Sequence, residues 1–136
     1  GHIMYKDDFF GYDDAMYVSL RFLRILSRKD ISLNEIMNLY PKTFSTPETR
    51  FEVEEKRKFE IVNEIKERLE RKNLNVISID GVRVDSKEGW WGIRASNTQN
   101  ALTVRAEALS SIFLQDMKYT IEDELKLSGI NFKFSF

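Results

Sequence analysis

An Asp-Gly pair at the junction of two alternating runs constrains the fold of this chain more than any other feature. Asp80 and Gly81 join NVISID to GVRVD, in which β-branched residues alternate with polar ones. Asp-Gly readily adopts the backbone of a two-residue turn, and alternation with a period of two is typical of a strand with one buried face. The sequence therefore predicts an antiparallel hairpin that turns at Asp80 and Gly81.

The segments that follow extend this hairpin into a meander. A second turn, SKEG, leads into the run WWGIRA, and the loop SNTQN leads into the run ALTVRAEA. Together with the first hairpin, these runs give at least four antiparallel strands. Residues 49–53 have the pattern of one more short strand. Of Trp90 and Trp91, we expect one ring to point inward and the other outward, because side chains alternate along a strand.

Two helices are predicted near the start of the chain. Residues 13–28 carry apolar side chains at helical spacing, with Asp13 or Asp14 as the cap. Residues 32–40 begin with the S-x-x-E spacing of a capping box. The next stretch, KTFSTPETR, has the composition of a linker or loop. We predict a domain boundary there, which divides residues 1–41 from residues 42–136.

Two longer helices are predicted after this boundary, at residues 54–72 and from Ser110 or Ser111 through Leu127. The residues predicted to face the core are Val62, Ile65 and Leu69 on the first, and Ile112, Met117, Ile121 and Leu125 on the second. The tail, residues 130–136, alternates apolar and polar side chains, which leaves open an edge strand or a loose terminus. These elements predict an α+β fold, with an antiparallel sheet packed against helices.

Length and composition exclude several classes of protein. A chain of 136 residues suits one domain with at most part of a second. It has no cysteine, which excludes thiol catalysis and cysteine metal sites, and its net charge of -1 gives no general attraction to nucleic acid or anionic lipid. No apolar run approaches the roughly 20 residues of a membrane span, and no secretory leader is visible. We expect a cytoplasmic protein that binds neither nucleic acid nor membrane.

The loop RASNTQN, residues 94–100, carries the chemistry that is easiest to interpret. Arg94 offers a planar fork of donors, Ser96 and Thr98 offer hydroxyls, and Asn97 offers an amide. These groups, with the backbone N–H groups of a turn, suit a phosphate. The alternative is a polar hairpin loop whose side chains satisfy only the turn, with Arg94 in water. From these residues alone the polar loop is favoured.

A longer stretch of the sequence favours the phosphate site over the polar loop. DGVRVDSKEGWWGIRASNTQNALTVRAEA resembles the C-terminal domain of the α-D-phosphohexomutases, particularly the bacterial phosphomannomutase/phosphoglucomutase branch. FSTPE resembles the hinge between the last two domains of that family, and GHIMYKDDFFGYDDAMY resembles the end of its sugar-binding domain. The resemblance implies a fold like that of the TATA-binding protein for residues 42–136, and two helices of the preceding domain in residues 1–41.

The resemblance also implies roles for individual residues. Arg94, Ser96, Asn97 and Thr98 match the loop that binds the phosphate that does not react, and Ser45 matches a hinge serine that reaches the same phosphate. His2 matches the histidine that closes the sugar-binding loop, although a Gly-His start can also come from cloning. Gln99 and Asn100 stand where the family commonly has other residues, often ending in proline, so the stiffness of the loop is left open.

The family's phosphoserine and its magnesium loop of three aspartates have no match here. The pairs Asp7-Asp8 and Asp13-Asp14 lack that spacing and are interpreted as structural, and the single histidine cannot supply a metal cluster. The resemblance therefore implies part of a mutase that interconverts hexose 1- and 6-phosphates, with Mg²⁺ and the other domains outside this chain and no activity in the chain alone. The alternative is a stand-alone module that binds a phosphorylated ligand or a protein.

Overall fold

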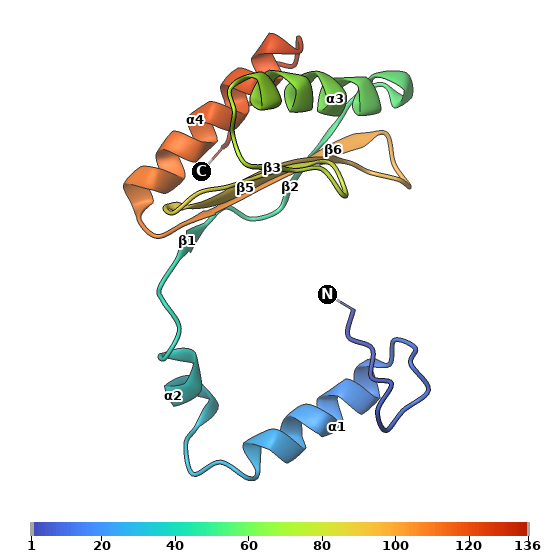
Figure 1. Ribbon diagram of the computed structural model, residues 1–136, viewed down its shortest axis with the longest axis vertical. Coiled ribbons are helices and arrows are strands. Elements are labelled where there is room, and N and C mark those ends of the chain that lie inside the picture. The colour runs from blue at the N-terminus through green and yellow to red at the C-terminus, as the bar shows by residue number, and fades with distance from the viewer. Residues whose placement is uncertain (1, 136) are drawn as a thin grey trace. The chain divides into compact units, whose positions relative to one another are not determined.

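The computed structural model describes residues 2–135, which belong to two compact units, Gly1–Pro41 and Lys42–Phe136 (Figure 1). The first unit holds helices α1 (Ala15–Leu26) and α2 (Leu33–Met37). Asp14 caps α1 by accepting a hydrogen bond from the Tyr17 N–H, and the predicted capping box of α2 is complete. Both predicted helices are confirmed.

Arg21 organises the segment that leads into α1. Its guanidinium lies 3.2 Å from the Asp7 carboxylate and 3.3 Å from that of Asp8, and it lies over the Tyr5 ring at 4.5 Å. Asp13 contacts the imidazole of His2. Each of these aspartates therefore has a partner within the first unit, as a structural role requires.

The second unit contains a six-stranded antiparallel sheet in the order β1-β6-β5-β4-β3, with β2 also paired to β6. The strands are β1 (Phe44–Ser45), β2 (Thr49–Glu52), β3 (Val76–Ile77), β4 (Val82–Asp85), β5 (Gly89–Ala95) and β6 (Ala101–Ala108). The predicted meander is therefore confirmed. The interpretation of KTFSTPETR as a linker or loop needs a correction. Phe44 and Ser45 of this stretch form β1, which pairs with the end of β6.

Helices α3 (Glu55–Arg71) and α4 (Ser111–Leu127) lie over the same face of the sheet (Figure 1). The core between these layers is formed by Ile61, Ile65 and Leu69 of α3, Met117, Ile121 and Leu125 of α4, and Val82, Val84, Trp91, Ile93, Leu102, Val104 and Ala106 of the sheet. The prediction that one tryptophan points inward is confirmed, because Trp91 is buried and Trp90 is half-buried beneath the Arg83 guanidinium.

Two predicted core positions need correction. Ile112 is 72% exposed. It lies five residues before Met117, which places it about 140° around the helix from the buried stripe. On α3 the buried stripe starts at Ile61, and Val62 beside it is only partly buried.

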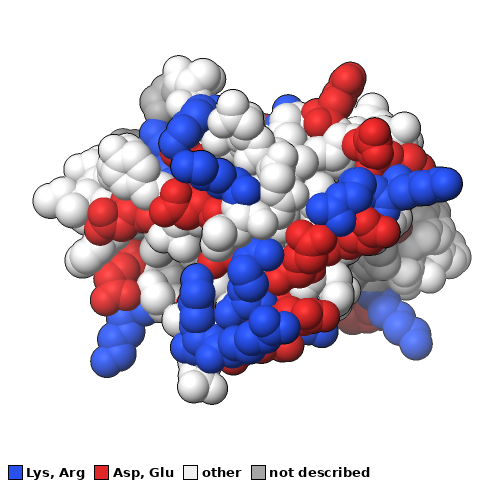
Figure 2. Space-filling view, turned by 90° about the horizontal axis from the view of Figure 1, so that it is seen from above, with Lys and Arg blue, Asp and Glu red and all other residues white. Residues whose placement is uncertain are grey.

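The outer surface of the two helices carries mixed charge. Seen from the side that α3 and α4 cover, Lys and Arg side chains alternate with Asp and Glu, and neither sign covers the face (Figure 2). None of the helices within residues 2–135 has both the length and the apolar character needed to cross a bilayer.

The first hairpin forms, but its turn is longer than predicted. The last residues that pair between β3 and β4 are Ile77 and Arg83, so residues 78–82 connect the paired parts of the two strands. Gly81 has φ +91°, and a Cβ there would lie 2.4 Å from the carbonyl oxygen of Ile93. The segment packs directly on β5, and this contact replaces the two-residue turn.

The tail is neither an edge strand nor a loose terminus. Phe132 is buried and stacks on Phe51 with 4.5 Å between the ring centroids. The Glu122 carboxylate accepts hydrogen bonds from the Lys133 ammonium at 2.5 Å and from the Phe134 N–H at 3.0 Å. The tail thus packs against the core at the end of β2. Residue 136 lies outside the described residues.

A buried carboxylate joins the two helices. Glu124 of α4 is 2% exposed, and its oxygens lie 2.8 Å from Arg68 Nε and 2.7 Å from Lys72 Nζ, both from the end of α3. Burial by itself would raise the pKa of Glu124, but the hydrogen bonds from Lys72 and Arg68 outweigh it and the pKa is lowered. The charged form therefore stabilises the folded state.

Gly81→Ala should destabilise the second unit more than Gly129→Ala does. Both glycines have positive φ, but nothing lies within 4 Å of a Cβ at Gly129. Gly129→Ala should therefore cost only the backbone term of about 1–2 kcal/mol. Gly81→Ala should cost about 1–3 kcal/mol more, because its methyl group meets the backbone of β5. Urea unfolding measures both, and equal losses would contradict the close packing described here.

The free energy of unfolding should fall as the pH drops below about 4.5, the ordinary pKa of a glutamate side chain. A lowered pKa in the folded state gives stability that is present above the unfolded value and lost as the pH falls through the folded value. Glu124→Gln should flatten this dependence, and at neutral pH it should cost about 1.5–3 kcal/mol. Glu67→Gln, at an exposed carboxylate beside Arg71, is the matched control. An equal acid sensitivity in both variants would refute the role of Glu124.

Candidate functional site

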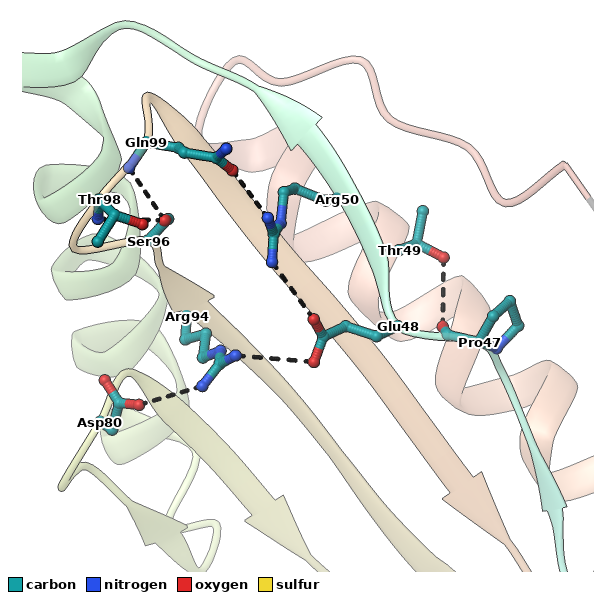
Figure 3. A network of polar contacts seen from close by, with 9 residues as sticks. All are labelled: Pro47, Glu48, Thr49, Arg50, Asp80, Arg94, Ser96, Thr98 and Gln99. Carbon is teal, nitrogen blue, oxygen red and sulfur yellow. Dashed lines mark hydrogen bonds and ion pairs between the residues drawn. The ribbon is translucent and has the colours of Figure 1, made fainter. Parts of the chain in front are cut away.

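The loop between β5 and β6 is organised by Ser96. The Ser96 N–H donates to the carbonyl of Ala101 at 2.9 Å, which closes the loop. The Ser96 hydroxyl oxygen accepts hydrogen bonds from the N–H groups of Gln99 at 3.1 Å and Thr98 at 3.4 Å (Figure 3). A serine that bonds the backbone two and three residues ahead is a local turn device. Part of the polar-loop interpretation therefore holds, and the hydroxyl also remains at the exposed surface.

Arg94 lies at the end of β5 with its side chain half exposed. Its guanidinium is 3.5 Å from the Asp80 carboxylate and 3.6 Å from the Glu48 carboxylate (Figure 3). Both separations are longer than a good charged hydrogen bond. Arg94 is therefore loosely paired, and its donors remain available to a stronger anion.

A second guanidinium reaches the same place from β2. The Arg50 side chain donates to the side-chain oxygen of Gln99 at 2.8 Å and lies 3.5 Å from Glu48. Glu48 thus stands between Arg50 and Arg94, with one carboxylate oxygen toward each (Figure 3). Sequence reasoning missed both residues, because only the pairing of β2 with β6 brings them to the loop.

The two guanidiniums and Ser96 line a hollow of about 220 Å³. Its lining residues are Arg50, Asp80, Arg94, Ala95, Ser96, Asn97, Thr98 and Thr103. Guanidinium, hydroxyl and amide donors converge there, as recognition of a small oxyanion requires. Two carboxylates, those of Glu48 and Asp80, balance the charges of the two arginines.

The other predicted site residues lie apart from this hollow. Ser45 pairs opposite Glu107, six residues along β6 from Ala101, which is about 20 Å of strand. His2 belongs to the first unit. The structure therefore groups Arg94, Ser96, Asn97 and Thr98 with each other, and does not group Ser45 with them. Among the described residues, no three acidic or histidine side chains converge as a metal site.

Comparison with known proteins identifies relatives of the chain. Residues 48–123 match the family model described as phosphoglucomutase/phosphomannomutase, C-terminal domain. A phosphomannomutase/phosphoglucomutase from Pseudomonas putida is 38% identical over 125 residues, which cover 92% of this chain and 27% of the relative. A phosphoglucomutase from Neisseria meningitidis is 37% identical over 110 residues, which cover 79% of this chain and 24% of that protein.

A solved structure shares the fold. A phosphoglucomutase/phosphomannomutase family protein from Burkholderia thailandensis matches all of this chain and 28% of its own length, with a TM-score of 0.82 and 28% identity. The chain thus spans about a quarter of the length of the relatives that it matches. Because the family model covers more than half of the 136 residues and agrees with the fold, the chain belongs to the phosphoglucomutase/phosphomannomutase family and contains its C-terminal domain.

Proposed function

We propose that this chain is the C-terminal part of a phosphohexomutase that interconverts hexose 1- and 6-phosphates, and that the hollow beside the loop binds the substrate phosphate that does not react. The observation that carries this proposal is the convergence of Arg50 and Arg94 with Ser96, Asn97 and Thr98 on one small hollow. Relatives named phosphomannomutase/phosphoglucomutase support the reaction class.

In this scheme the chain positions the substrate and makes no bond itself. A sugar hydroxyl oxygen forms the new bond to phosphorus as the bond to a serine oxygen breaks, and the serine later takes back the other phosphoryl group. The serine, the base that accepts the hydroxyl proton and the Mg²⁺ ligands would all lie outside this chain. Holding one phosphate directs the far hydroxyl to the reacting centre, and this orientation is the chain's contribution.

Charge decides how a phosphate would enter the hollow. Glu48 carries one negative charge, and its two oxygens lie 3.5 Å from the Arg50 guanidinium and 3.6 Å from the Arg94 guanidinium. A phosphate monoester carries a charge of about -1.5 to -2 at neutral pH and three acceptor oxygens. It can therefore bond both guanidiniums at once, where Glu48 offers each a single oxygen. We propose that Glu48 moves aside when the phosphate binds.

Other roles remain predictions. Residues 1–41 would be the end of the sugar-binding domain, with His2 on the sugar, and Ser45 would need a change at the hinge to reach the phosphate. A stand-alone module that binds a phosphorylated ligand or a protein is less well supported, because the relatives are about four times longer than the match. A cytoplasmic location and a hexose phosphate substrate are part of the same proposal.

Arg94→Ala in the full-length enzyme should lower kcat/KM by roughly ten- to a hundredfold or more, because charge-assisted bonds of about 1.5–3 kcal/mol are lost. Arg94→Lys should restore only part of this loss, since a point charge cannot reproduce the planar fork. Arg105→Ala, at an exposed arginine on β6 that does not line this hollow, is the control. Steady-state kinetics on folded variants decide the matter, and unchanged constants for both Arg94 variants would exclude the assignment.

Glu48→Gln should tighten the binding of inorganic phosphate to this chain. We expect the wild-type chain to bind phosphate with a Kd in about the millimolar range. Removing the competing charge should lower this Kd by about three- to tenfold. Glu52→Gln, at an exposed glutamate at the end of β2, should leave the Kd unchanged. NMR titration measures both, and weaker binding by Glu48→Gln would show that Glu48 is not a competitor.

A further inference from the structure

A lysine ammonium is buried directly beneath the loop. Lys58 of α3 is 2% exposed, and its neighbours along the buried stripe of the helix are Ile61, Ile65 and Leu69. A buried lysine is unusual, because removing an ammonium from water is costly unless it is paired. A cation near the N-terminal end of a helix is also disfavoured by the helix dipole. An apolar side chain would fill this position without these penalties.

The partners of Lys58 show what the ammonium holds. Its Nζ donates to the backbone carbonyl of Gln99 at 3.0 Å and lies 3.1 Å from the Glu55 carboxylate. The Glu55 side chain is 59% exposed, so the ion pair is open to water on one side. The Gln99 carbonyl, in contrast, belongs to the loop that lines the hollow. The buried donor is therefore directed at the backbone of the candidate site.

Gln99 connects this ammonium to the serine that organises the loop. Its N–H donates to the Ser96 hydroxyl oxygen at 3.1 Å, and its carbonyl accepts from the Ala101 N–H at 2.9 Å as well as from Lys58. The Val53 N–H, just before α3, donates to the Asn100 carbonyl at 2.9 Å. The end of the loop is thus tied to the Lys58 side chain of α3 and to the backbone just before this helix, and a rotation at Gln99 would break its hydrogen bond to the Ser96 hydroxyl.

These contacts also bear on the stiffness of the loop. Gln99 and Asn100 leave the backbone free of the restriction that a proline would impose. The hydrogen bond from Lys58 and the bond from Val53 restrict the same two residues from below. Arg50 restrains the Gln99 side chain from the exposed side. Of these restraints, Lys58 is the one that offers a charged, buried donor.

We propose that Lys58 is a positioning residue for the anion site: its buried ammonium holds the Gln99 carbonyl and so keeps the loop of residues 96–99 in the conformation that binds a phosphate. This inference rests on the proposed function. Lys58 does not itself touch the ligand, and it acts through the Gln99 backbone and the Ser96 hydroxyl.

The test compares Lys58→Met with Lys66→Met in the whole 136-residue chain. Methionine keeps the length and apolar body of lysine but removes the donor. Lys66 is on the same helix, and its ammonium lies 3.8 Å from Glu70, away from the loop. Three quantities are measured for each variant: the melting temperature, the hydrogen exchange of the Gln99 and Ala101 amides, and the Kd for inorganic phosphate by NMR titration.

Lys58→Met should exchange the Gln99 and Ala101 amides faster than the wild type and should raise the phosphate Kd by about tenfold, close to the loss of one charge-assisted hydrogen bond. Its melting temperature should change little, because the methionine gains apolar contact where the lysine had a costly buried charge. Lys66→Met should match the wild type in exchange and in Kd. If Lys58→Met keeps wild-type amide exchange and a Kd within about twofold of the wild type, the inference is wrong.

Two other outcomes are also decisive. If Lys58→Met does not fold, Lys58→Gln replaces it with the same expectations, because glutamine is polar but too short to keep the ammonium contact. If the wild-type chain binds no phosphate, the proposed function fails, and amide exchange still tests the hold on the loop without any ligand. Faster exchange would then support the contact from Lys58, and unchanged exchange would overturn it.

Discussion

Strand β6 is paired along both of its edges, and the rest of the second unit depends on this pairing. One edge carries β5 along seven residues, and the other carries β2 and then β1. Between these two short strands, Thr46 is fully buried and bonds the Ala106 backbone in both directions. The inner side chains of β6 lie in the core beneath α3 and α4. The strand therefore joins residues 44–46, the loop and the helices into one folded unit.

The candidate site is located where β6 begins, and the strands paired with β6 bring its residues together. Arg94 arrives on β5, Arg50 and Glu48 arrive with β2, and Lys58 approaches from α3 beneath the loop. Among these exposed groups, the carboxylates of Glu48 and Asp80 balance the charges of Arg50 and Arg94. The buried Lys58 ammonium donates to the backbone of the loop. In the proposed scheme the exposed groups would bind the anion, and Lys58 would keep the loop in place.

Local signals predicted most of the elements correctly, and most of the errors come from contacts between segments that are far apart in the chain. The capping box, the Asp14 cap and the meander all follow from neighbours in the sequence. The prediction of a two-residue turn was wrong because Gly81 packs on β5 against Ile93, which lies more than ten residues further along the chain. For the tail, the sequence allowed an edge strand or a loose terminus. The tail is neither, because Phe132 stacks on Phe51, a residue far from it in the chain. Ile112 was a plain error of helical phase.

The sequence by itself determined the α+β elements, the family and the loop with its arginine, because hydrophobic period, capping and turn chemistry act between residues a few positions apart. It did not reveal Arg50, Glu48 or Lys58 as parts of the site. Arg50 and Gln99 are 49 positions apart, and Lys58 and Gln99 are 41 apart. Such pairs meet only after β2 pairs with β6 and α3 packs on the sheet. Only the tertiary structure decided which charges face the loop, because long-range pairing leaves no periodic signal in the chain.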